Sequence, residues 1–445
     1  MRPSLTHIFG AWWPLAASWL FMSIEQPLVG AVIARQADPT VHLAALGGLV
    51  FPLALVIEAP IIMLLAASTA LSKDRQAYGL IYRFMMIAAF SLTLLHALLA
   101  FTPLFDLIVV GLLNPPAEVV EPARWGLMIM LPFTWSIAYR RFHQGLLIRH
   151  GRSLSVSVGT VIRLVALVTG VLVGLWLGLP GIVVGTMGIS AGVLTEAAFI
   201  GWQVRPIVTG KLTENSETPL TWAVFRRFYT PLALTSLLLL AVQPLGSAAL
   251  SRMPEALASL AAWPVLASFI FLFRGLGMAY NEVVVAMLEK RGAWGSLRRF
   301  TLLLAFGMTA LLSGVALSPL ARGFFGGVMG LEPPLAALAA SGLLLALVWP
   351  ALTVYQSLYQ GVLVHSGKTQ TITQSVIASL LTSALLLVAG AVYGRVPGLY
   401  VVTVAFVVGS AVQVAWLMRS SQDALSVLEA RDAEPAASVQ AAAAD

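Results

Sequence analysis

The sequence predicts an all-α polytopic membrane protein with twelve transmembrane helices, arranged as two similar six-helix bundles. Three observations lead to this fold class. The chain of 445 residues is 59% hydrophobic and only 10% charged, with a mean hydropathy of +0.90, whereas soluble domains carry about 25% charged residues. Its apolar runs are continuous and long enough to cross a bilayer as helices. The strands of a membrane β-barrel are shorter and alternate between apolar and polar residues. The second half of the chain also repeats the first.

Apolar segments follow one another along the chain with short loops between them. Helices suit such segments because they satisfy their own backbone hydrogen bonds in lipid. The expected helices cover 9–35, 42–71, 77–110, 122–148, 154–178, 181–204, 223–252, 256–288, 294–319, 334–364, 370–393 and 397–418. These segments predict an N-terminal lobe over 1–204, a cytoplasmic linker over 205–222, a C-terminal lobe over 223–418 and a disordered cytoplasmic tail over 419–445.

Positive charge in the loops predicts the orientation. Most of the 26 Lys and Arg residues fall in loops on the side of the N-terminus, and the other side holds only Arg35, Arg124, Arg252, Arg322 and Arg395. Because positive loops stay in the cytoplasm, we expect both termini there. The predominance of Arg over Lys indicates a GC-rich bacterial genome, and therefore a multi-pass protein of the bacterial inner membrane. The net charge of +7 includes no basic run or stripe, so no nucleic-acid partner is expected.

The internal repeat aligns residues 14–204 with residues 231–418 at a nearly constant offset. Matched positions include Gln26-Pro27 with Gln243-Pro244, Tyr139 with Tyr355, Gln144-Gly145 with Gln360-Gly361, and Pro180-Gly181 with Pro397-Gly398. Each half has an even number of helices, so the repeats are parallel and related by a pseudo-two-fold axis along the membrane normal. Two such bundles enclose a central cleft that rocking opens to either side in turn, which indicates a transporter.

Several local motifs resemble a known group of proteins. They are Glu25-Gln26, Leu43-Ala44-Ala45-Leu46-Gly47, Ser72-Lys73-Asp74-Arg75 and His143-Gln144-Gly145-Leu146-Leu147-Ile148-Arg149-His150. Over nearly its whole length the chain resembles the multidrug/oligosaccharidyl-lipid/polysaccharide (MOP) exporter superfamily, which includes the multidrug and toxin extrusion (MATE) transporters. Within it, the likeness is closest to the progressive ankylosis proteins, exporters linked to pyrophosphate, nucleotides and citrate. The resemblance implies a MATE-like fold. The first helix lacks the Asp positions of many multidrug members and has Glu25 nearby.

Ionisable residues inside the predicted helices are candidates for function, because charges at the bilayer midplane are costly and usually line a cavity or pair. The first half holds Glu25, Glu58, Arg140, Arg141, Arg163 and Glu196, and the second half holds Arg274 and Glu282. Two interpretations remain open. The charges neutralise one another and fix helix packing, or they line the cleft and bind a substrate or a proton.

The spacing of these residues predicts an anion site. Arg140 and Gln144 lie four residues apart on one helix face, as do Gln356 and Gln360 in the repeat. Guanidinium groups bind phosphate and carboxylate well. The candidate substrate-binding residues are therefore Arg140, Gln144, Arg163, Arg274, Gln356, Gln360 and His143. Three carboxyl groups that could carry a coupling proton are Glu25, Glu58 and Glu196.

The predicted function is a secondary exporter that moves a small organic or phosphate-bearing anion by alternating access. The alternatives are a proton- or sodium-coupled multidrug antiporter of organic cations and a non-transporting membrane scaffold. Gly188-Ile189-Ser190-Ala191-Gly192 fits a hydrolase motif but lies in an apolar helix, so no enzyme is expected. The expected partners are a small-molecule substrate, the lipid bilayer and a coupling proton or sodium ion. No cofactor or metal is expected, and we expect a monomer.

Overall fold

The computed structural model describes residues 3–210, 212 and 220–433, and this part of the chain is helical without any β-strand. Segments labelled η are π-helical. The first half contains α1 Leu5–Ser23, α2 Glu25–Ile33, α3 Pro39–Leu43, η1 Ala44–Val50, α4 Phe51–Ile62, α5 Leu64–Leu71, α6 Arg75–Phe101, η2 Asp106–Leu113, α7 Ala117–Ile129, α8 Leu131–Arg149, α9 Ser153–Trp176 and α10 Gly181–Gly210. The second half contains α11 Trp222–Leu250, α12 Ala256–Met278, α13 Tyr280–Leu288, α14 Ala293–Ala316, α15 Leu320–Arg322, η3 Gly323–Val328, α16 Pro333–Leu345, α17 Trp349–His365, α18 Thr369–Tyr393, α19 Gly398–Ser420 and α20 Gln422–Ala433.

Every segment expected to be helical contains helix. Ten spans of the described chain are long and apolar enough to cross a membrane, or eleven if α16 and α17, which bend by 43° at their junction, count as one. The expected segment 122–148, now α7 and α8, is absent from that set. Its helix α8 carries Arg140, Arg141, His143 and Gln144, which lower its hydropathy.

Several expected helices are broken. The first, 9–35, is interrupted at Ile24, and the fourth, 122–148, is interrupted at Met130. Proline explains two of the breaks, because α8 begins Leu131-Pro132 and α17 begins Trp349-Pro350. A proline provides no backbone N–H and crowds the preceding turn. Hydropathy averaged over a span does not reveal these breaks, because they fall between two helices that follow each other closely.

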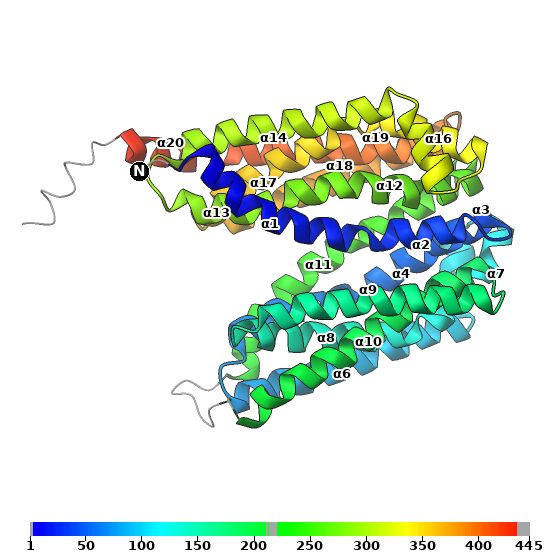
Figure 1. The fold of residues 1–445 in the computed structure, drawn as a ribbon, viewed down its shortest axis with the longest axis horizontal. Coiled ribbons are helices and arrows are strands. Elements are labelled where there is room, and N and C mark those ends of the chain that lie inside the picture. Colours follow the sequence, from blue (N-terminus) through cyan, green and yellow to red (C-terminus); the bar gives the residue numbers. More distant parts are fainter. Residues whose placement is uncertain (1–2, 211, 213–219, 434–445) are drawn as a thin grey trace, which may run out of the picture.

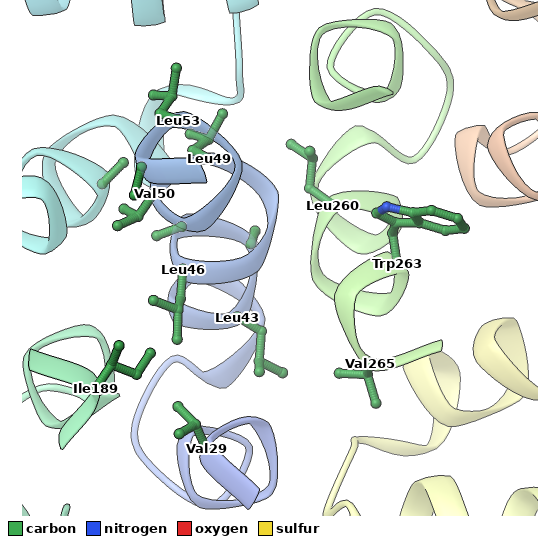
Figure 2. Packing of buried hydrophobic residues seen from close by; sticks show 14 of the residues in the cluster. Val29, Leu43, Leu46, Leu49, Val50, Leu53, Ile189, Leu260, Trp263 and Val265 are labelled. Atoms are coloured by element: carbon green, nitrogen blue, oxygen red, sulfur yellow. The ribbon is translucent and has the colours of Figure 1, made fainter. Parts of the chain in front are cut away.

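Two bundles diverge from one end of the molecule to the other (Figure 1). We call the end with α3, α7, η2 and η3 the closed end, and the end with α20 and the start of α1 the open end. At the closed end, η1 packs against α12 of the other lobe. Leu46, Leu49 and Leu260 belong to one buried apolar cluster there (Figure 2). A Cβ atom at Gly47 would overlap the ring of Pro264, so the two lobes approach as closely as glycine allows.

The first helix of each half begins in the opposite lobe. Helix α1 packs on α12, α13 and α14, whereas its continuation α2 packs on α10. Helix α11 likewise packs on α4, where Tyr229 Oη donates a hydrogen bond to Pro60 O. In the equivalent contact, Trp12 Nε1 donates to Leu276 O over 2.9 Å. The crossing of the first helix into the opposite lobe therefore occurs in both repeats, with matching contacts.

The predicted linker and tail are partly wrong. Residues 205–210 continue helix α10, and of the linker 211 and 213–219 lie outside the described residues. Within the tail predicted to be disordered, 422–433 form α20, and 434–445 lie outside the description. Helix α20 is held by its buried Leu428 and by Arg431, whose Nη1 donates to Leu288 O over 2.9 Å. The polar composition of this segment did not indicate a helix, because contacts with the rest of the protein stabilise it.

Candidate functional site

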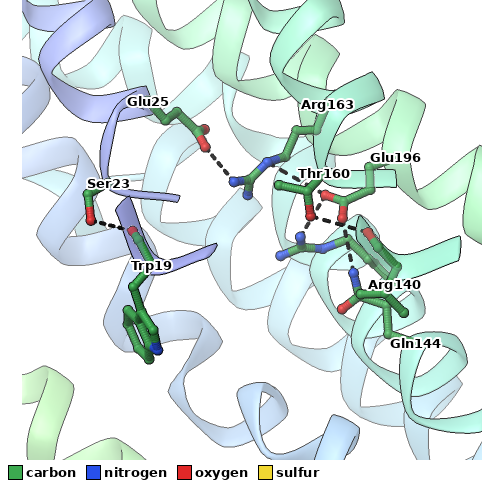
Figure 3. A network of polar contacts seen from close by, with 9 residues as sticks. Trp19, Ser23, Glu25, Arg140, Gln144, Thr160, Arg163 and Glu196 are labelled. Atoms are coloured by element: carbon green, nitrogen blue, oxygen red, sulfur yellow. Dashed lines mark hydrogen bonds and ion pairs between the residues drawn. The ribbon is translucent and has the colours of Figure 1, made fainter. Parts of the chain in front are cut away.

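The N-terminal lobe contains a buried network of charges centred on Glu196 of α10. Arg140 Nη1 of α8 contacts Glu196 Oε2 at 2.6 Å, and Gln144 Nε2, one turn along α8, donates to Glu196 Oε1 over 3.0 Å. Figure 3 shows these side chains converging between α8, α9 and α10. The four-residue spacing thus places Arg140 and Gln144 on one helix face, as predicted, but both side chains bind a carboxylate of their own lobe.

A second ion pair extends this network to the start of α2. Arg163 Nη2 of α9 lies 2.7 Å from Glu25 Oε2, and its Nε lies 3.6 Å from Glu196 Oε2. The side chains of Arg163 and Glu25 are 14% and 12% exposed, whereas Glu196 is fully buried. Removing one partner of a buried pair leaves a charge without compensation, which is strongly destabilising. The inner part of the network therefore fixes helix packing, and the Arg163–Glu25 pair is its more exposed part.

Two charged groups of this lobe stay outside the network. Glu58 of α4 is 1% exposed, and its Oε1 has no hydrogen-bond partner. Arg141 of α8 is half-buried, and among the described residues it forms no ion pair or hydrogen bond. A guanidinium that lacks a direct acid partner is available to an anion.

The equivalent region of the C-terminal lobe has one interior arginine. The Arg274 guanidinium lies 4.4 Å from the centre of the Trp349 ring, and its Nε donates to Thr353 Oγ1 over 3.1 Å. No carboxylate of the described residues forms an ion pair with Arg274. The half-buried Gln356 and Gln360 form no hydrogen bond with the described chain. At these interior positions the described part of the C-terminal lobe therefore has a cation and amides without hydrogen-bond partners rather than ion pairs.

The remaining candidates lie elsewhere. His143 is buried in an aromatic cluster, where its ring lies 4.1 Å from that of Tyr139 at an angle of 47°, and its Nδ1 lies 2.8 Å from Tyr139 O. Ser190, the central residue of the hydrolase-like motif, lies within α10 and donates to Ile129 O over 3.1 Å. Among the described residues, no group of three or more His, Asp or Glu side chains could hold a metal ion.

The structure brings together part of the predicted site. Arg140, Gln144, Arg163, Glu25 and Glu196 form one network, whereas Arg274, Gln356 and Gln360 belong to the other lobe and Glu58 makes no hydrogen bond to either group. Sequence reasoning missed Gln413 of α19, which the repeat offset at Pro397 aligns with Glu196. Gln413 is buried and its Nε2 has no partner. Extending the repeat alignment through the last helix could have found it.

Comparison with known structures identifies the architecture. The chain has a TM-score of 0.71 with a multidrug resistance MATE family transporter of the MOP superfamily in its inward-facing conformation, at 15% identity, covering 94% of this chain and 100% of that one. It has a MATE-like fold. The TM-score is 0.69 with lipid II flippase MurJ in an inward closed conformation, at 14% identity and coverage of 94% and 91%. No protein-family model and no curated protein sequence matches the chain.

A MATE family transporter in an outward-facing conformation gives a lower TM-score of 0.60, at 15% identity with 96% and 97% of the two chains covered. The narrower resemblance to the progressive ankylosis proteins finds no support in these comparisons, which reach MATE transporters and MurJ instead.

Proposed function

We propose that this protein is an alternating-access exporter of small organic or phosphate-bearing anions, of the nucleotide, pyrophosphate or citrate class. It works as a monomer in the bacterial inner membrane, with both termini in the cytoplasm and the open end facing inward. The MATE-like fold supports the transport mode. The observation that carries the substrate class is Arg274, an interior guanidinium with no acid partner in the described chain. Such a group binds carboxylate or phosphate.

We assign substrate contact to Arg274, Gln356 and Gln360, with Arg141 as the contribution of the N-terminal lobe. Arg140 and Gln144 both bind Glu196. We therefore assign them a structural role that stabilises the site, without direct contact to the substrate. Arg163 is a secondary candidate because its side chain is not fully buried.

The test is transport into proteoliposomes of labelled ATP, pyrophosphate or citrate, measured against an ethidium-like dye. We expect Arg274→Gln to lower anion flux at least about tenfold, which corresponds to about 1.4 kcal/mol of lost binding. Its stability should fall by no more than about 1–2 kcal/mol, because the contacts with Trp349 and Thr353 are lost but no buried charge is left unpaired. Arg124→Gln, at the exposed closed end, is the matched control and should transport normally. Movement of the dye without any of the anions would contradict the proposal.

A second candidate function is a proton- or sodium-coupled antiporter of organic cations. It is favoured by Glu58, a buried carboxyl group whose Oε1 has no hydrogen-bond partner. Because Glu25 and Glu196 already pair with arginines, Glu58 is the strongest of the three proton-carrier candidates. Glu58→Gln should abolish the dependence of flux on a pH gradient while the protein stays folded. If the dependence persists unchanged, Glu58 is not the carrier.

A further inference from the structure

Two arginines join the lobes at the closed end, and the repeat relates them. Arg35 follows α2 of the first half, and Arg252 follows α11 of the second half at the matching position. Arg35 Nη2 donates to Gly327 O and Val328 O of η3, both over 2.9 Å. Arg252 Nη2 donates to Leu112 O of η2 over 2.6 Å, and its Nη1 to Leu113 O over 3.1 Å. Each arginine thus reaches the π-helical segment of the opposite lobe.

Each guanidinium also binds the end of its own helix. Arg35 Nη1 donates to Ala31 O over 2.6 Å, and Arg252 Nη1 donates to Ala248 O over 2.8 Å. The last carbonyl groups of a helix lack intrahelical donors and carry partial negative charge. In both places a helix end of one lobe therefore meets the end of η2 or η3 from the other, and a cation lies between them. Without that cation, the two sets of carbonyl oxygens would repel.

We propose that Arg35 and Arg252 form a paired latch that holds the closed end shut, and that both must release for the transporter to open there. The closed end is also held by the apolar contact of Gly47 and Gly48 with Pro264 and Leu260. Apolar contact favours closure, while the guanidinium bonds fix the register of the helix ends. Because a two-fold axis relates the two bonds, one rocking movement breaks both. The latch depends on the alternating-access part of the proposed function but not on the substrate.

The absence of cysteine from the sequence makes the latch testable with introduced thiols. Leu260→Cys reports on the closed end, because Leu260 is fully buried against Gly48 of the other lobe. A spin-label pair at Ser153→Cys and Ser366→Cys reports on the open end, where both positions are exposed and belong to different lobes. Both measurements use the detergent-solubilised full chain, so neither requires knowledge of membrane sidedness or substrate. Both measurements therefore test the latch even if the protein does not transport anions.

The variants are Arg35→Gln, Arg252→Gln and the double variant. In the double variant we expect maleimide labelling of Leu260→Cys to accelerate at least about tenfold, and the distance between spin labels to gain a shorter population. The two single variants should have similar, smaller effects. Arg124→Gln is the matched control, because Arg124 pairs with Asp106 at the same end but within one lobe.

Three results would overturn the latch. The first is labelling in the double variant no faster than in Arg124→Gln. The second is faster labelling without any shorter open-end distance, which indicates local loosening rather than a shift between conformations. The third is an effect from only one of the two single variants, which would contradict a paired device. Replacing both arginines by lysine keeps the charge but loses the forked geometry, so that variant should fall between wild type and the double Gln variant.

Discussion

The two lobes share a helical frame and differ in the chemistry of their interiors. In the N-terminal lobe, Arg140 of α8 binds Glu196 of α10. At the matching positions of the C-terminal lobe stand Gln356 of α17 and Gln413 of α19. One lobe is thus tied internally by charge, and the other carries amides at the same places. Duplication preserved the packing surfaces, while the groups available to a ligand diverged.

A second pair of matched positions shows the same divergence with the charge reversed. Glu58 in the first lobe corresponds to Arg274 in the second. Glu58 is almost fully buried, whereas Arg274 is half-buried and stacks on Trp349. The matched positions therefore differ in both the sign of the charge and its burial. Three predictions test how far the difference between the lobes extends.

The largest effect is expected from the buried ion pair. Glu196→Ala leaves Arg140 without its partner, which should lower the free energy of unfolding by about 3–5 kcal/mol. Gln413→Ala at the matching position removes a similar side chain without stranding a charge, and should cost clearly less. The double variant Glu196→Gln with Arg140→Gln copies the C-terminal lobe and should recover most of the loss. Melting in detergent, followed by size-exclusion chromatography, measures all of these, and equal losses in the two Ala variants would refute the charge argument.

A smaller difference is expected between the matched glycines Gly145 and Gly361. A Cβ at Gly145 would lie 2.5 Å from the backbone oxygen of Leu65, whereas a Cβ at Gly361 would lie 2.5 Å from the side chain of Val284. Overpacking costs about 1–3 kcal/mol, and a side chain yields more easily than a backbone. Gly145→Ala should therefore lower the melting temperature more than Gly361→Ala. Both variants gain the same helix propensity, so a reversed order would contradict the packing geometry.

The smallest effect is expected at the surface, where the lobes should not differ. Arg124–Asp106 in the first half and Lys368–Asp423 in the second are exposed ion pairs at 2.7 and 3.4 Å. Exposed pairs contribute about 0–1 kcal/mol and are screened by salt. Asp106→Asn and Asp423→Asn should each shift unfolding by no more than about 0.5 kcal/mol, and less in 1 M salt. A loss above about 1 kcal/mol in either variant would show that the pair is structural.

Hydropathy, loop charge and the repeat were sufficient to predict a twelve-segment helical membrane protein of two similar lobes. These features are periodic or additive along the chain. Each residue contributes to them in the same way whichever residues it contacts in the folded protein. The same features identified the interior charges, and counting placed Arg140 and Gln144 on one face of α8. They did not predict the break at Ile24 or the helix at 422–433, because neither changes the average hydropathy as a loop or a span would.

Packing between helices decided which of those charges neutralise one another. Arg140 and Arg141 are adjacent in sequence, yet one is bound to Glu196 and the other has no ion pair or hydrogen bond in the described chain. The exchange of α1 and α11 between lobes and the two arginine bonds at the closed end also join residues far apart in sequence. An ion pair or hydrogen bond acts over a few ångströms, so it exists only once the fold has brought both partners to the same place.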